Sequence, residues 1–281
     1  MVFLGFSLWR GDRNAYSGKI REIRETGFDY VEVSFDFPWP LQDNGLLRKI
    51  GEEICENGLL LAVHGGWRDV KLASPINEVR EASLKYVLKT VEEAKRMEPL
   101  YMLFHMATEQ AVKEMDEYTK AVKDAAVNSM NTLVMRAEEL DIRLVFENVP
   151  SQFLADPHDA EAVFLEVGNA RLCFDVGHAW MYEVRREENV SVGSVVERWF
   201  SGLGRWISGL HIYDCLAING CLKEHILPGV DSEFLRAVID NRQKYDVASD
   251  FVVVEAFKNI RGEDVKPSEL QGVVELLRKG L

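Results

Sequence analysis

The chain has 281 residues, of which 47% are hydrophobic and 28% are charged, and its formal net charge is −13. This composition is ordinary for a globular protein, and the acidic balance argues against a broad positively charged face. A nucleic-acid substrate is not excluded, because bound divalent cations are missing from the formal charge.

Short apolar runs alternate with helix-like segments along the whole chain. The first run is apolar, but Arg10 ends it too early for a signal peptide or a membrane span, so we expect a cytoplasmic protein without membrane association. Eight runs have the length and composition of strands that are buried on both faces. They are Val2–Leu8, Tyr30–Phe35, Leu59–Val63, Leu100–Phe104, Arg143–Phe146, Arg171–Phe174, Ile207–Leu210 and Phe251–Val254.

Helical periodicity fills the segments between these strands, apart from a loop with Gly220 and Gly229 after the seventh strand. Eight strands that alternate with eight helices predict one α/β domain over residues 1–281, a single (β/α)8 TIM barrel. The predicted helices are Tyr16–Thr26, Leu46–Cys55, a helix that starts at Ser74-Pro75, a long one over about 108–140, Asp156–Val167, Ser194–Phe200, Asp231–Tyr245 and Pro267–Lys279.

The four cysteines show no C-x-x-C spacing, so we expect no disulfide framework and a reducing compartment. Cys173 falls within a predicted strand and is expected in the core. The cysteines therefore do not predict a metal site.

Six of the predicted strands, the third to the eighth, end in residues that can bind a metal. Because the carboxyl ends of the strands meet at one mouth of such a barrel, these side chains should form a ring. His178 and His225 lie in the turns that follow strands six and seven, so five of the six histidines fall on this face. The six strand-end residues are His64, His105, Glu147, Asp175, His211 and Glu255.

This mixture of imidazoles and carboxylates suits Zn2+, Mn2+ or Fe2+. A carboxylate such as Glu147 can bridge two ions, and two ions can activate a water and stabilise the leaving oxygen of a phosphoester. A single ion can instead polarise a sugar carbonyl while neighbouring groups move a proton. Trp39 and Trp67 lie in loops at the same end, where they either pack in the core or stack on a sugar or base.

At these residues the sequence resembles the xylose isomerase-like TIM barrel superfamily, and within it endonuclease IV (AP endonuclease family 2). The resemblance covers most of the chain. Its closest local match runs from His64 to Pro75 and looks like a motif in which a histidine ligand precedes an aromatic residue and an Asn-Leu-Ala-Ser-Pro run. Phe104-His105, Phe146-Glu147-Asn148, Asp175-Val176-Gly177-His178 and Val254-Glu255 match in the same order.

The resemblance implies one to three divalent ions per chain, Zn2+ first and Mn2+ as the alternative. His64, His105 and Glu147 would hold one ion, and His178 and His225 would be two ligands of another. A further ion would be held by Glu147, Asp175, His211 and Glu255. It also implies catalytic roles for Glu147, Glu255 and His178.

The chain departs from the nuclease pattern at several positions. Lys223 stands where the third metal site of the family has an aspartate, and one hypothesis is that its ammonium group replaces some of that ion's charge and contacts substrate. The basic DNA-contacting loop after strand two is here the acidic and aromatic stretch Asp36–Pro40, and Trp67 holds the place of a DNA-stacking tyrosine. The metal ligands are therefore better retained than the DNA-reading surface.

Three functions remain open. The leading hypothesis is a multinuclear phosphoester hydrolase that acts on abasic DNA or a sugar phosphate, because His64, His105 and His225 would be superfluous in a one-metal isomerase. The alternative is a single-metal sugar (phosphate) isomerase or epimerase, although the segment Tyr213–Ala217 lacks the arginine that ketose epimerases place there. The third is a binding module without turnover. We expect no obligate protein partner.

Overall fold

The structure is a computed structural model that describes residues 2–36, 44–107, 116–150, 153–187, 190–218 and 221–281. Eight parallel strands close into a barrel in the order β1-β10-β7-β6-β5-β4-β3-β2, which confirms the predicted (β/α)8 fold. The strands of the barrel are β1 (Phe3–Leu8), β2 (Tyr30–Phe35), β3 (Leu60–Gly65), β4 (Met102–His105), β5 (Leu144–Glu147), β6 (Arg171–Asp175), β7 (Ile207–Ile212) and β10 (Phe251–Val254).

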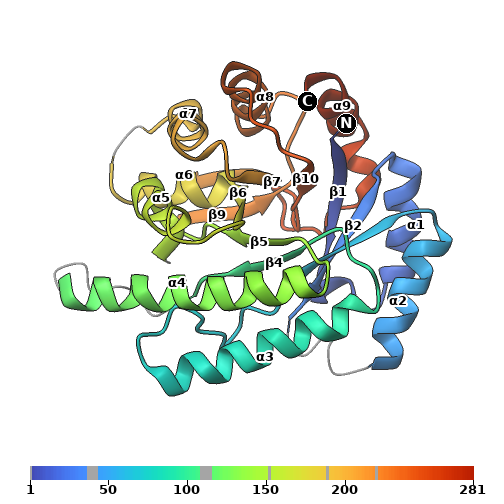
Figure 1. The fold of residues 1–281 in the computed structure, drawn as a ribbon. Helices are drawn as coiled ribbons and strands as arrows, with labels where there is room; N and C mark the ends of the chain where they lie inside the picture. Colours follow the sequence, from blue (N-terminus) through green and yellow to red (C-terminus); the bar gives the residue numbers. More distant parts are fainter. Residues whose placement is uncertain (1, 37–43, 108–115, 151–152, 188–189, 219–220) are drawn as a thin grey trace.

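Helices surround this barrel, and α3 and α4 run side by side along it (Figure 1). Within the described ranges, no helix is long and apolar enough to cross a membrane. The helices are α1 (Tyr16–Thr26), α2 (Asn44–Glu56), α3 (Asn77–Lys95), α4 (Asp116–Glu139), α5 (Pro157–Phe164), α6 (Val176–Val184), α7 (Val192–Leu203), α8 (Glu233–Tyr245) and α9 (Gln271–Gly280).

The strands bury two separate apolar cores, because side chains alternate across each strand. In β2, Val31, Val33 and Phe35 pack outward against the helices, whereas Tyr30 points into the barrel. The interior core is small, and it includes Cys173 as the sequence predicts. Its members are Tyr30, Ala62, Tyr101, Leu103, Val145, Cys173, Phe251 and Val253.

Three local predictions are wrong. The expected loop after β7 contains an antiparallel hairpin, β8 (Asp214–Ile218) and β9 (Cys221–Ile226), which lies outside the barrel and therefore lacks a clear burial pattern. Helix α6 was not predicted, and it follows β6 directly because Asp175 caps it. The helix expected at Ser74 begins at Asn77, since the Ser74 hydroxyl instead accepts a hydrogen bond from the Ile76 N–H (3.2 Å).

A glycine in β1 allows a tyrosine ring to fill the barrel interior. A Cβ atom added at Gly5 would lie 2.3 Å from the Tyr30 ring. We therefore expect Gly5→Ala to lower the free energy of unfolding by about 1–3 kcal/mol in urea denaturation. The control is Gly18→Ala in α1, where a Cβ meets nothing within 4 Å. That change should stabilise the protein by about 0.5–1 kcal/mol, and equal effects at the two sites would contradict the prediction.

Candidate metal centre

Four of the six strand-end residues, His64, His105, Glu147 and Glu255, line one cavity of about 590 Å³. Both aromatic and charged side chains form the wall of the cavity. Its lining residues are Ser7, Trp9, Ser34, Asp36, His64, Trp67, Arg68, His105, Glu147, Val149, Pro150, His178, Arg185, Glu224, His225, Glu255 and Phe257.

Four buried residues can converge on one point, and two of them, Glu147 and Glu255, also line the cavity. Each offers one donor atom, and these atoms all lie within 4.8 Å of one another. His211 comes from β7, and its Nδ1 atom lies 3.0 Å from Glu255 Oε2, 3.7 Å from Glu147 Oε2 and 3.9 Å from Asp175 Oδ2. The four-residue centre is Glu147, Asp175, His211 and Glu255.

This centre fits a divalent cation. Asp175 Oδ2, His211 Nδ1 and Glu255 Oε2 are buried and make no hydrogen bond with any described residue. Buried polar atoms without a partner are rare and costly, so three of them facing one point indicate a ligand. Three carboxylates and one imidazole form a donor set that suits Mn2+ or Zn2+ and balances the ion's charge.

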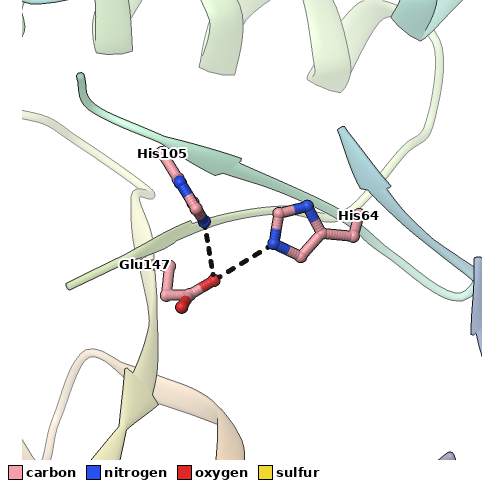
Figure 2. A group of neighbouring side chains, drawn as sticks. All are labelled: His64, His105 and Glu147. Atoms are coloured by element: carbon pink, nitrogen blue, oxygen red, sulfur yellow. Dashed lines mark hydrogen bonds and ion pairs between the residues drawn. The ribbon is translucent and has the colours of Figure 1, made fainter. Parts of the chain in front are cut away.

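A second group uses the same glutamate. Glu147 Oε2 lies 3.2 Å from His105 Nε2 and 3.4 Å from His64 Nε2, and Figure 2 shows both rings directed at this oxygen. The Nδ1 atom of His64 lies 2.9 Å from the Gly65 carbonyl, so Nδ1–H donates there and Nε2 faces Glu147. Glu147 therefore belongs to two possible ligand groups, as a bridging residue must.

A third group contains His178 and His225, and its acid is Glu224. His178 Nε2 lies 3.9 Å from Glu224 Oε2. Lys223, for which the sequence suggested substrate contact and a charge role at this site, is exposed and is not among the residues that line the cavity. Side chains alternate along a strand, but His225 has a φ of 55°, which lets Glu224 and His225 face the same cavity.

Neighbouring groups orient Asp175. Its Oδ1 atom accepts hydrogen bonds from the backbone N–H of His178 (2.6 Å) and from the Tyr213 hydroxyl (2.9 Å). The Asn148 side chain donates to the Asp175 carbonyl and accepts from the Asp175 N–H, both at 2.8 Å. These contacts leave Oδ2 of Asp175 for a ligand. His178, which the sequence placed in the turn after the sixth strand, instead belongs to the start of helix α6.

The buried charges shift the pKa values of these groups. Burial lowers the pKa of His64, but the hydrogen bond and charge of Glu147 outweigh it and raise this pKa to about 9. Burial also opposes a charge on His178, yet Asp175 and Glu147 raise its pKa to about 10. At His105 burial dominates and lowers the pKa. Burial raises the pKa of Asp175 to about 7.

Cation uptake is therefore expected to release protons. His64 holds a proton below about pH 9. Burial opposes a charge on His211, but the groups around it, Glu32 and Glu255 among them, outweigh burial and raise its pKa well above the ordinary value. Each of the two histidines must lose a proton to bind a metal. At pH 7.5 we expect roughly one proton or more released per chain, and an affinity that rises as the pH approaches the pKa of His64. Zn2+ calorimetry in buffers of different ionisation enthalpy measures this release.

The control for this experiment is His158→Gln, because His158 is an exposed residue on α5 and does not line the cavity. That variant should release as many protons as the wild type. A binding heat that does not depend on the buffer would contradict the predicted release.

The structure also shows which residues could contact a substrate. Trp67 lines the cavity and is 40% exposed, with its ring stacked on His105 at 6.0 Å, whereas Trp39 lies outside the described residues. Sequence patterns missed Trp9 and Phe257, which stack at 4.6 Å on the wall of the cavity. The signal was available, since both follow the ends of barrel strands.

The closed parallel barrel places buried carboxylates and imidazoles at the carboxyl ends of its strands, which is where barrel enzymes carry their active sites. The chain belongs to the xylose isomerase-like TIM barrel family, whose family model matches residues 20–275. No curated protein sequence matches the chain.

Solved structures resemble the chain over its full length. D-psicose 3-epimerase from Clostridium cellulolyticum H10 has a TM-score of 0.74 and 15% identity, and the match covers 100% of this chain and 99% of that chain. A putative xylose isomerase from Rhodospirillum rubrum has a TM-score of 0.75 and 18% identity, with 100% of both chains covered. The 3-keto-D-glucoside 4-epimerase from E. coli has a TM-score of 0.69 and 16% identity, with 99% and 100% covered. At these identities the likeness shows the fold alone.

Proposed function

We propose that the protein is a divalent-metal-dependent sugar isomerase or epimerase. The observation that carries this proposal is the four-residue centre, in which three buried donor atoms lack any hydrogen-bond partner in the described part of the chain. Mn2+ or Zn2+ suits its donors. Full-length similarity to structures named as epimerases of psicose and of a keto-glucoside supports the same class.

The two glutamates of this centre form the acid–base pair. A bound divalent ion would supply the positive charge that polarises a ketose carbonyl and acidifies the neighbouring C–H group. Glu147 on β5 and Glu255 after β10 are separated in the barrel by β6 and β7, so they approach a substrate from different sides. One takes the proton from carbon, and the other returns a proton to the opposite face.

The other residues of the cavity suit a sugar. The Nδ1 atom of His178 lies 3.0 Å from both the Asn148 carbonyl and Glu147 Oε1, which leaves Nε2 to donate a hydrogen bond to a substrate oxygen. Trp9 and Phe257 on one wall and Trp67 on another give apolar surfaces for the faces of a sugar ring.

A phosphoester hydrolase is the second candidate, and a specific observation favours it. His64 and His105 meet Glu147, and His178, Glu224 and His225 form a further group, so the cavity has donors for more than one ion. Two ions near each other can activate a water and stabilise a leaving oxygen.

One experiment separates the two candidates. We expect the wild-type protein, loaded with Mn2+, to exchange the proton beside the carbonyl of a ketose for deuterium, in a panel that includes sugar phosphates. His64→Ala should then cost less than about 10-fold in exchange rate, because His64 lies outside the four-residue centre. Cleavage of abasic duplex DNA that His64→Ala lowers by about 10³-fold, without any exchange, would overturn the proposal in favour of the hydrolase.

A further inference from the structure

A fully buried carboxylate lies inside the barrel beneath the candidate metal centre. Glu32 is the third residue of β2 and is 0% exposed. Its neighbours in register are Ser7 on β1 and Ala62 on β3, and Ala62 belongs to the apolar interior core. Burying a carboxylate in such surroundings is costly unless specific partners compensate.

Glu32 has two such partners, and both meet the same oxygen. The Tyr101 hydroxyl donates a hydrogen bond to Glu32 Oε2 at 2.7 Å, and His211 Nε2 lies 3.3 Å from this atom. The hydroxyl of Tyr30 lies 3.3 Å from that of Tyr101, one step further from the histidine. A chain of side chains thus leads from the interior core to His211.

His211 therefore has a different environment at each ring nitrogen. Its Nε2 atom faces Glu32, whereas its Nδ1 atom faces Asp175 and Glu255 and makes no hydrogen bond with any described residue. An imidazole that binds a cation through one nitrogen carries its proton on the other, and a carboxylate acceptor orients that N–H. With a cation bound at Nδ1, Glu32 would therefore accept a hydrogen bond from Nε2–H of His211.

We propose that Glu32 is a positioning residue of the metal centre, which fixes the tautomer and the ring orientation of His211 through Nε2–H. Tyr101 in turn holds the Glu32 carboxylate in place. Glu32 is not a ligand itself, since its contact is with the far side of the imidazole. Sequence patterns missed it because it lies inside an apolar run and not at a strand end.

The test measures the affinity of the whole chain for Co2+ by equilibrium competition, together with the visible absorption bands of the Co2+-loaded protein and its melting temperature. Glu32→Gln should weaken Co2+ binding by roughly 10–100-fold and shift the absorption bands, since the acceptor loses its charge. Tyr101→Phe should weaken binding by a smaller factor. Tyr30→Phe is the matched control, because it removes from the same core a hydroxyl that makes no hydrogen bond with Glu32. This variant should bind Co2+ like the wild type.

The outcomes separate a positioning role from a merely structural one. A folded Glu32→Gln variant with wild-type affinity and unchanged absorption bands would overturn the proposal. If that variant does not fold, the tyrosine pair decides, and equal affinity in Tyr101→Phe and Tyr30→Phe would overturn it as well. Because this role presupposes the metal-dependent function proposed above, a wild-type chain that takes up no Co2+ would refute that function itself.

Discussion

Glu147→Gln is expected to lower kcat/KM by about 10³-fold or more, which corresponds to about 4 kcal/mol of transition-state stabilisation. Glu147 is 1% exposed and belongs to two of the possible ligand groups. Its Oε2 atom lies within 3.2–3.7 Å of nitrogens of His64, His105 and His211. An amide has no negative charge and binds cations weakly, so both the metal shell and one acid–base group are lost.

The measurements are steady-state kinetics and metal content per chain, on protein purified without chelator or an affinity metal. Glu224→Gln is the matched control, since Glu224 is an acid at the exposed rim of the same cavity and belongs only to the third group. Its effect should be much smaller than that of Glu147→Gln if the four-residue centre does the chemistry. Full activity in Glu147→Gln would refute the whole site assignment.

Two substitutions of Asp175 should have equal effects on activity and different effects on stability. Both Asp175→Asn and Asp175→Ala remove the charged Oδ2 atom, which faces His211, so each should lower kcat/KM by about 10³-fold. Oδ1 accepts from the His178 N–H at the start of α6 and from the Tyr213 hydroxyl. Asparagine keeps an acceptor oxygen there, whereas alanine does not.

We therefore expect only Asp175→Ala to lose the helix cap, at a cost of about 0.5–2 kcal/mol, and to melt several degrees lower than Asp175→Asn. Thermal unfolding of the metal-free proteins at one pH measures this difference and keeps metal binding out of the comparison. Equal melting temperatures would show that Oδ1 does not stabilise α6. Retained activity in Asp175→Asn would remove Asp175 from the centre.

The sequence predicted the elements of the barrel because their causes are local. Strands buried on both faces are short continuous apolar runs, and the first polar residue after each run marks its carboxyl end. That logic placed His105 and Glu147 at the last residues of β4 and β5, and His64 one residue before the end of β3. The eight-strand closure then follows from the alternation of strands with helices.

Other features had no local signal. Glu32 is a single acid in an apolar run, and its role depends on His211, which is 179 positions away in the chain. The β8–β9 hairpin lies outside the barrel, so burial imposes no clear pattern on its residues. Glu224, and not Lys223, joins His178 and His225 in the third group because His225 has a positive φ. No property of these side chains indicates that backbone conformation.

The sequence by itself determined the family, the order of the strands and helices, and the residue types that gather at the mouth of the barrel, because side-chain period and apolar burial act over a few neighbouring residues. Only the tertiary structure decided which ligand groups share Glu147 and which nitrogen of His211 faces the four-residue centre. Those facts depend on distances across a closed barrel, and distances between remote strands are determined by closure and packing and not by local pattern.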